Sequence, residues 1–342
     1  MKLKIISDIH LEFPGARDAL PEIVVNTDAI GLLGDIGNPL KQAYTDFLLE
    51  MSDKFSHVFV VPGNHEYYAN EFQLTNQLIE KICAKRENIH CLNKATFDWG
   101  DEFRVIGTTL WSTAPEEYRD EIQSASTDHK KIITQIDEEY LPHPENVDEL
   151  NLGEHWDKLQ IHGTKFSIQE KVSLHEEQAE WIKEEVEKAK NENKKVIILT
   201  HHAPTSKKSL PWAVLQDKAA EYDSCTDMEG LLDEHVKLWG FGHTHYNCDQ
   251  IINHTRVVSN QLGYVRRTNP TFDGALVLDL SLDDAELKQT VEERQKQIEE
   301  VQLQLDEEAE KKAQQQREKQ QEALKVKETN KEDTKASKCA IA

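Results

Sequence analysis

The chain of 342 residues has few of the features that mark secreted or membrane proteins. Its five cysteines include no Cys-x-x-Cys pair and are odd in number, which argues against a disulfide framework. No apolar run reaches the length of a signal-peptide core or of a membrane-spanning helix. A formal net charge of −23 makes strong binding to a nucleic-acid backbone unfavourable. These absences favour a cytoplasmic protein, and 38% hydrophobic residues suffice for a sizeable core.

Metal-ligating side chains follow directly after five short aliphatic runs. The runs are rich in Val, Ile and Leu and are bounded by turn residues, a pattern typical of buried strands. They are Lys2–Ser7, Ala29–Leu33, Val58–Val61, Val196–Leu199 and Val236–Trp239. The side chains after them are Asp8 and His10, Asp35, Asn64 and His65, His201 and His202, and His243 and His245. Because ligands bind outside the carboxyl ends of strands in open α/β sheets, we expect these side chains to gather at one sheet edge.

Each of these clusters alone is a weak signal. An isolated Gly34-Asp35 pair is more often a turn carboxylate, and two histidines after a strand more often lie in a surface loop. Residues two apart in an extended chain point to the same side, so Asp8 and His10 can aim at one ion. All five clusters in order, each at the end of a strand, predict a metal centre.

The motifs resemble those of the calcineurin-like metallophosphoesterase superfamily, which read D-x-H, G-D, G-N-H-[DE], H and G-H-x-H. All are present in this order within roughly residues 1–282, as Asp8/His10, Gly34-Asp35, Gly63-Asn64-His65-Glu66, His201 and Gly242-His243-Thr244-His245. The resemblance implies an α/β fold, a two-layer β-sandwich flanked by helices, that carries two divalent metal ions. It also implies hydrolysis of a phosphomonoester or phosphodiester by a hydroxide that bridges the metals.

The resemblance further implies a role for each motif residue. The first metal would be held by Asp8, His10, Asp35 and His245, and the second by Asp35, Asn64, His201 and His243. Asp35 would bridge the two ions, and His65 would act beside the phosphate as an acid or electrostatic catalyst. Independently, imidazoles and carboxylates without a thiolate favour Mn, Fe, Zn or Ni, with Mn preferred in vitro. A shared carboxylate also offsets the repulsion between two cations.

Two stretches depart from the serine/threonine protein phosphatases of the superfamily. Those enzymes extend G-D into G-D-x-x-D-R-G and place Leu-Arg before G-N-H-E, whereas residues 34–40 and 61–63 contain no arginine here. Without two guanidiniums the site lacks a bidentate grip on phosphate. We therefore expect a small phosphoester as substrate. A protein phosphatase and a non-catalytic scaffold are the alternatives, although a scaffold has no chemical need for a complete ligand set.

Residues 112–195, inside the expected catalytic domain of residues 1–282, contribute no ligand. The segment is expected to be a largely helical insertion, with a helix over Ile168–Lys190. A cap that shapes substrate access and a solvated insertion both fit its polar, acidic composition. Further strands are expected over Phe103–Leu110, Arg256–Asn260 and Ala275–Leu280.

The composition changes at about residue 282. From Asp284 to Lys338 there is no Gly, Pro or aromatic residue, and Glu, Lys and Gln dominate, which favours a long C-terminal helix. Val291, Ile298 and Leu305 recur every seven residues, a spacing that predicts a short coiled-coil seam and weak self-association. The alternative for residues 283–342 is a solitary charged helix that grades into disorder.

The last four residues, Cys339-Ala340-Ile341-Ala342, match the C-a-a-X prenylation motif, with a terminal residue of the farnesyl class. Residues 311–342 contain 9 Lys/Arg against 5 Asp/Glu, and basic stretches of this kind accompany lipids on anionic membrane surfaces. In a host with prenyltransferases, the sequence therefore predicts lipidation of Cys339 and peripheral attachment to the cytoplasmic face of a membrane.

Overall fold

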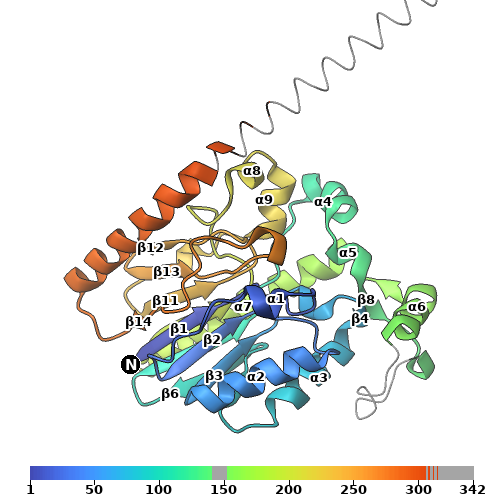
Figure 1. Cartoon of the computed structure of the whole chain (residues 1–342), viewed down its shortest axis with the longest axis horizontal. Helices are drawn as coiled ribbons and strands as arrows, with labels where there is room; N and C mark the ends of the chain where they lie inside the picture. The colour runs from blue at the N-terminus through green and yellow to red at the C-terminus, as the bar shows by residue number, and fades with distance from the viewer. Residues whose placement is uncertain (141–151, 306, 309–310, 312–313, 315–342) are drawn as a thin grey trace, which may run out of the picture. The chain divides into compact units, whose positions relative to one another are not determined.

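The computed structural model describes the chain except for residues 141–151, 306, 309–310, 312–313 and 315–342. Its centre is a sandwich of two mixed sheets with helices on the outer faces (Figure 1). This arrangement confirms the predicted α/β sandwich, and a helix over residues 284–305 confirms the predicted C-terminal helix.

The first sheet is built from the N-terminal part of the chain. Its order is β14 (Leu278–Asp279), β1 (Lys2–Ile6), β2 (Ala29–Leu33), β3 (His57–Val61) and β5 (Ile89–Cys91). β1, β2, β3 and β5 are parallel, so the ends of β1, β2 and β3 lie at one edge. β14 adds to β1 in antiparallel direction and is shorter than the strand expected over Ala275–Leu280, because residues 275–277 pair with no neighbour.

The second sheet is built mainly from the later part of the chain. Its order is β12 (Asp249–Ile252), β13 (Thr255–Ser259), β11 (Val236–Phe241), β10 (Lys195–Thr200), β7 (Phe103–Thr108) and β6 (Ala95–Trp99). The four inner strands are parallel, and β12 and β6 run antiparallel at the edges. The ends of β10 and β11 therefore lie at one edge, as predicted.

Aliphatic side chains from both sheets form the core between them. Ile5, Leu33 and Phe59 of the first sheet pack in one cluster with Leu199 and Leu238 of the second, and all five are fully buried. Burial of this kind stabilises a fold by about 25 cal/mol for each Å² of apolar surface removed from water. The continuous aliphatic runs noted in the sequence are thus strands covered on both faces.

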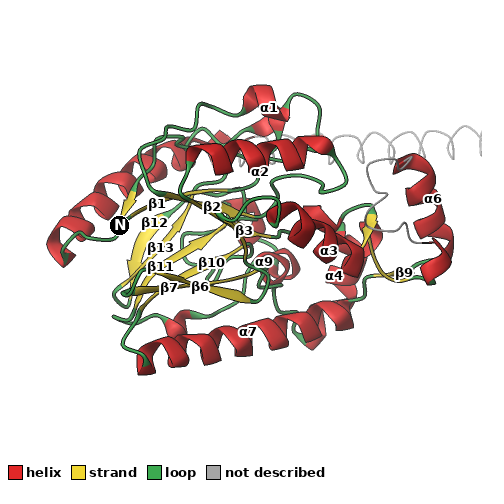
Figure 2. Ribbon diagram, turned by 90° about the horizontal axis from the view of Figure 1, so that it is seen from below, coloured by secondary structure: helices red, strands yellow, loops and turns green. Residues whose placement is uncertain are grey.

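Helices cover the two outer faces of the sandwich (Figure 2). α2 (Gln42–Lys54) and α3 (Phe72–Cys83) pack on the first sheet through Phe47, Leu48 and Ile79. α7 (Ile168–Asn191) packs on the second sheet through Ile182 and Val186, and a capping box of Ser167 and Glu170 fixes its start. The helix predicted over Ile168–Lys190 is therefore present as α7, but it packs on the second sheet and is not part of a separate insertion.

The segment before α7 stands beside the sandwich. It contains α4 (Arg119–Ala125), α5 (Asp128–Lys131), β8 (Ile132–Gln135), α6 (Leu152–His162) and β9 (Thr164–Lys165). β8 and β9 form a small third sheet with β4 (Asn70–Glu71), which lies just after the His65 loop. The insertion is thus anchored next to a predicted functional loop, and its β-structure was not foreseen. The remaining α-helices up to β14 are α1 (Ala16–Ala19), α8 (Trp212–Leu215) and α9 (Lys218–Ser224).

The C-terminal helix packs on the edge of the second sheet. Val291 and Ile298 are each 4% exposed, and the compact unit that holds both sheets extends to Ile298. The side chain of Gln295 accepts a 2.7 Å hydrogen bond from the backbone N–H of Asp249, and Arg294 donates to the Asp249 carboxylate at 3.1 Å. Two residues of the predicted coiled-coil seam are therefore already buried within the chain.

The predictions for the end of the chain lie largely outside the described residues. Cys339 and the basic stretch before it fall in this part, so lipidation stays a prediction from the sequence. Among the described residues, no helix has both the length and the apolar character needed to cross a membrane.

Packing of the C-terminal helix can be tested with two substitutions on that helix. Ile298→Ala should lower the free energy of unfolding by about 2–5 kcal/mol, because it removes buried methylene groups and leaves a cavity. Leu303→Ala is the control, since Leu303 is 62% exposed. Urea unfolding followed by circular dichroism would measure both. Equal midpoints for the two variants would contradict a structural role for the helix.

Candidate metal centre

The predicted ligands of both sheets come together beyond the strand ends. Three groups of ligand-type side chains each have their donor atoms within 4.8 Å of one another. The groups are Asp8 with His10 and His245, His10 with Asp35 and His65, and Asp35 with His201 and His243. The first sheet supplies the aspartates, His10 and His65, and the second sheet supplies His201, His243 and His245. The site exists only where the two halves of the sandwich meet.

The first group is centred on the buried carboxylate of Asp8. Ser7 donates to its Oδ2 at 2.5 Å, and the backbone N–H of His243 donates to both of its oxygens at 3.1 Å. His245 Nε2 lies 3.3 Å from Asp8 Oδ1 and 3.0 Å from His10 Nε2. Burial alone would raise the pKa of Asp8, but the surrounding imidazoles hold it below its usual value. Asp8 is thus a fixed, ionised carboxylate beside two imidazoles.

The second group contains a contact that only a cation explains well. The Nδ1–H of His201 donates to the Leu33 carbonyl at 2.9 Å, which leaves a lone pair on His201 Nε2. That nitrogen faces the Asn64 Oδ1 at 3.0 Å, and His243 Nδ1 lies 3.2 Å from the same oxygen. Asn64 is held in this orientation because its Nδ2 donates to Asp128 at 2.8 Å and to Tyr68 at 3.1 Å. The lone pair of His201 Nε2 therefore faces the lone pairs of Asn64 Oδ1. A divalent cation fits between these two atoms.

The protonation of the group also suits a metal. Burial lowers the pKa of His10 to about 4 and lowers the pKa values of His201 and His243. Neutral imidazole is the form that binds metal ions. Burial, Glu66 and Asp8 raise the pKa of Asp35 well above its usual value, so this carboxylate lacks a compensating positive charge among the described residues. A divalent cation would supply it.

Five of the seven predicted ligands have left-handed backbone conformations. The φ angles are 56° at Asp8, 55° at His10, 52° at Asp35, 71° at His243 and 49° at His245. Non-glycine residues adopt such angles rarely, and each instance costs about 1–3 kcal/mol that the surrounding structure must offset. Because of these sharp turns, the side chains that follow the strand ends point toward one another.

Glu66 ties two of these loops together. Its carboxylate accepts backbone N–H groups from Asp35 at 2.9 Å, Ile36 at 2.8 Å, Gly37 at 3.3 Å and Gly63 at 2.8 Å. Gly63 is required for this approach, because a Cβ atom there would lie 2.3 Å from Asp35 Oδ1. Glu66 is therefore part of the scaffold of the site, and its carboxylate oxygens point at backbone.

His65, the predicted catalytic side chain, lies beside the predicted ligands. Its backbone N–H donates to Asp35 Oδ1 at 2.8 Å, and its ring lies against His10 and Tyr68 with centroids 4.5 and 4.2 Å away. His202, which follows His201 in the sequence, joins no ligand group among the described residues. It is fully buried, with its ring 4.0 Å from that of His243.

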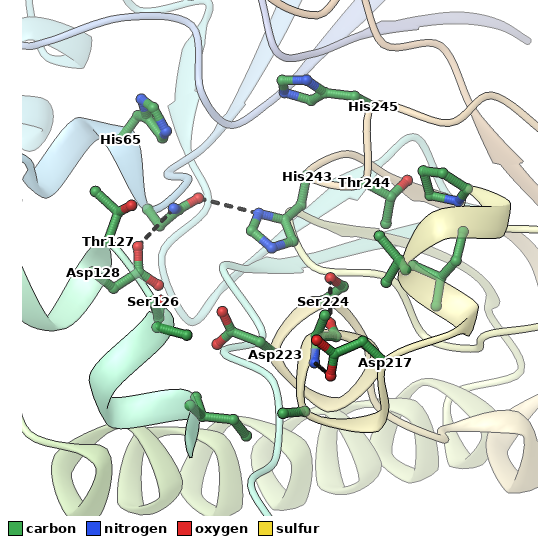
Figure 3. Close-up of a pocket in the computed structure, with 18 of the residues that line it drawn as sticks. His65, Ser126, Thr127, Asp128, Asp217, Asp223, Ser224, His243, Thr244 and His245 are labelled. Carbon is green, nitrogen blue, oxygen red and sulfur yellow. Dashed lines mark hydrogen bonds between the residues drawn. The ribbon is translucent and has the colours of Figure 1, made fainter. Parts of the chain in front are cut away.

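A cavity of about 430 Å³ opens onto these side chains (Figure 3). Asp35, Asn64, His65, His243 and His245 line its inner end. Its outer walls come from α4 and α5 on one side and from the segment of residues 210–224, with α8 and α9, on the other. Two helices of the insertion, α4 and α5, therefore line the cavity.

The family assignment follows from a match over most of the chain. Residues 1–247 match the model of the calcineurin-like phosphoesterase family. The chain belongs to the calcineurin-like phosphoesterase family. It is thus a hydrolase of phosphoric esters, and its buried histidine and aspartate clusters correspond to the dimetal site of such enzymes.

Two further similarities cover most of this phosphoesterase. The uncharacterized protein L509 of Acanthamoeba polyphaga mimivirus is 28% identical over 292 residues, which cover 78% of this chain and 92% of the viral protein. The crystal structure of a phosphopantetheinyl hydrolase from Mycobacterium tuberculosis superposes with a TM-score of 0.53 at 16% identity, over 78% of this chain and 90% of that one. At this identity, the similarity supports the fold alone.

Two residues of the phosphoesterase site escaped the motif search. Glu12 Oε1 accepts from His10 Nδ1 at 3.1 Å and from His65 Nδ1 at 2.9 Å, so one carboxylate orients both rings. Burial alone would raise the pKa of Glu12, but these two hydrogen bonds lower it to about 2. Tyr264 places its hydroxyl 3.2 Å from His65 Nε2 and stacks on His10 with centroids 4.3 Å apart. The only sequence signal for Glu12 was its spacing two residues after His10.

Removal of the Glu12 carboxylate should disturb both rings that it orients. Glu12→Ala should weaken Mn²⁺ binding or turnover by roughly 10- to 100-fold, the usual effect of losing a partner that orients a ligand. Titration calorimetry with Mn²⁺ measures binding without relying on catalysis. Glu80→Ala, on the exposed side of α3, is the control for loss of one negative charge. Identical binding and turnover in the two variants would exclude the orienting role.

Proposed function

We propose that this phosphoesterase hydrolyses a small phosphoester with two divalent cations held by Asp8, His10, Asp35, Asn64, His201, His243 and His245. The observation that carries the proposal is the position of Asp35, which shares one group with His10 and His65 and another with His201 and His243, while His10 also belongs to the group of Asp8 and His245. A carboxylate with two oxygens can serve both groups at once. His10, Asp8 and His245 would complete the first ion's set, and Asn64, His201 and His243 the second's. Mn, Fe, Zn and Ni all suit these ligands.

When bound, the two cations would activate water and stabilise the charge that develops on the phosphate oxygens. The protein's own residues prepare the surroundings. Glu12 fixes the Nδ1–H of His65, so that Nε2 of His65 faces the cavity beside Tyr264. We assign to His65 Nε2 the transfer of a proton to the leaving oxygen, and its position in the cavity supports this role.

The cavity supports a small substrate. No Lys or Arg lines it among the described residues, so a guanidinium clamp like that of the protein phosphatases is absent there. Its volume of about 430 Å³ lies in the range of small-molecule pockets. The complete ligand set and an accessible cavity favour an enzyme over a scaffold. Attachment through Cys339 remains a separate prediction from the sequence.

The bridging role of Asp35 can be tested by metal content. Asp35→Asn should lose both metals together, because a neutral amide cannot offset two cations, whereas His10→Ala should damage mainly one site. Elemental analysis of the purified variants after dialysis would decide between them. Two full equivalents of metal in the Asp35 variant, with normal turnover of p-nitrophenyl phosphate, would remove the bridge assignment.

The role of His65 can be separated from metal binding. His65→Asn should keep both metals but lose roughly 10² to 10⁴ in kcat, a typical contribution of a general acid. The loss should shrink as the leaving group improves, because good leaving groups need no proton. A series of aryl phosphates of different leaving-group pKa would measure this trend. An equal loss across the series would indicate that His65 positions the phosphate and does not transfer a proton.

A further inference from the structure

Tyr264 lies in a loop that is bonded to the backbone of the metal centre. The loop follows β13, and the backbone N–H of Gly263 donates to the Asp8 carbonyl at 3.0 Å. Gly263 has a φ angle of 80°, a conformation that favours glycine. On the other side, the N–H of Arg267 donates to the Tyr264 carbonyl at 2.7 Å. The backbone of Tyr264 is therefore fixed next to the first group of predicted ligands.

The ring of Tyr264 covers two predicted ligands of the first ion. It stacks on His10 with ring centroids 4.3 Å apart, and it meets the ring of His245 edge-on with centroids 4.6 Å apart. The residue is nevertheless 40% exposed and lines the active-site cavity. Packing against two rings restricts the aromatic side chain, so its hydroxyl is held in one direction.

The hydroxyl of Tyr264 has hydrogen-bonding capacity left. Its one partner among the described residues is His65, whose Nε2 lies 3.2 Å away. A phenolic hydroxyl can both donate and accept, so this contact uses only part of its capacity. By contrast, the hydroxyl of Tyr68, which also lines the cavity, donates to Asp128 at 2.7 Å and accepts from Asn64 at 3.1 Å. Of these two tyrosines, Tyr264 is therefore the one that can serve a ligand.

The cavity has no charged side chain that could grip a phosphate by its negative oxygens. Among the described residues, no Lys or Arg lines it. Phosphate oxygens that face no predicted cation still need hydrogen-bond donors, because a polar group taken out of water without a partner is costly. Tyr264 and His65 place a hydroxyl and a ring nitrogen side by side at the cavity. One phosphate group can therefore reach both.

We propose that Tyr264 is a further catalytic residue, whose hydroxyl donates a hydrogen bond to a non-bridging oxygen of the substrate phosphate beside His65. This inference rests on the proposed phosphoesterase function and adds a residue to it. In the free protein the hydroxyl and His65 Nε2 satisfy each other. In the complex each exchanges this contact for a substrate oxygen. His65 serves the leaving oxygen, and Tyr264 serves an oxygen that stays on phosphorus and keeps its own proton throughout.

Binding of inorganic phosphate tests the contact without turnover. Tyr264→Phe keeps the ring that packs on His10 and His245 and removes only the hydroxyl. The Mn²⁺-loaded variant should bind phosphate roughly 10- to 100-fold more weakly than wild type, the usual effect of losing a hydrogen bond to a charged group. Titration calorimetry would give both dissociation constants, and elemental analysis should find equal Mn²⁺ in both proteins. Equal phosphate affinity, or loss of Mn²⁺ from the variant, would overturn the proposal.

Tyr118→Phe is the matched control for removal of a phenolic hydroxyl. The ring of Tyr118 also packs against another aromatic ring, that of Tyr222, with centroids 5.3 Å apart, but Tyr118 does not line the cavity. This variant should bind phosphate as wild type does. A loss as large as that of Tyr264→Phe would show that the effect does not come from a contact in the cavity, and would contradict the proposal.

Aryl phosphates of different leaving-group pKa separate the role of Tyr264 from that of His65. A contact with a non-bridging oxygen does not depend on the leaving group, so Tyr264→Phe should lower kcat/KM by the same factor across the series. His65→Asn should instead lose less as the leaving group improves. A Tyr264→Phe loss that also shrinks with better leaving groups would show that the hydroxyl acts through His65, and the phosphate contact would be wrong.

Failure of this inference can be told from failure of the proposed function. If the wild-type protein binds phosphate but hydrolyses no ester, the phosphoesterase proposal fails, and calorimetry on Tyr264→Phe still decides the contact. If the wild-type protein hydrolyses p-nitrophenyl phosphate and Tyr264→Phe equals it in kcat/KM and in phosphate affinity, the role of Tyr264 alone is overturned.

Discussion

The site depends on one buried carboxylate that binds no metal. Glu66 accepts four backbone N–H groups from the loops after β2 and β3 and so fixes Asp35 in a left-handed conformation. Asp35 in turn accepts the backbone N–H of His65, which positions the catalytic candidate. Strained backbone persists only where surrounding contacts over-determine it, and Glu66 provides such contacts at both loops. A glutamine in place of Glu66 would turn an NH₂ group, itself a donor, toward backbone N–H donors. Only a carboxylate offers acceptors on both of its oxygens.

The charges of the site are arranged in layers around the predicted metals. Ionised Asp8 and neutral, buried imidazoles present lone pairs inward, and Asn64 is turned the same way by Asp128. Glu12 and Tyr264 surround His65 without joining a predicted ligand set. Glu121 and Asp217 line the same cavity.

The sequence was informative where function is encoded locally. A short aliphatic run followed by a ligand motif reports both a strand and its end, so β1, β2, β3, β10 and β11 and the predicted ligands could be placed. Contacts between distant segments leave no such pattern. Tyr264 reaches His65 across 199 positions in the chain, and Asp128 reaches Asn64 across 64. The seven-residue spacing of Val291 and Ile298 predicted a coiled-coil seam, but the same spacing fits the edge of a sheet, and both residues are buried within the chain. Only the fold shows that this helix face packs on the second sheet of the same chain.

The pairing of the first strand with the last has a consequence for synthesis of the protein. β1 lies between β2 and β14, and its register with β14 joins Lys2 to Asp279. While the chain is made, Asp8, His10, Asp35 and Asn64 leave the ribosome long before His201, His243 and His245. The early residues alone offer three of the four proposed ligands of the first ion and two of the four of the second, and one edge of β1 stays unpaired until β14 has emerged. Domains generally fold as units, and long-range pairing is slow. We therefore expect the nascent chain to acquire tightly bound metal only after translation is nearly complete.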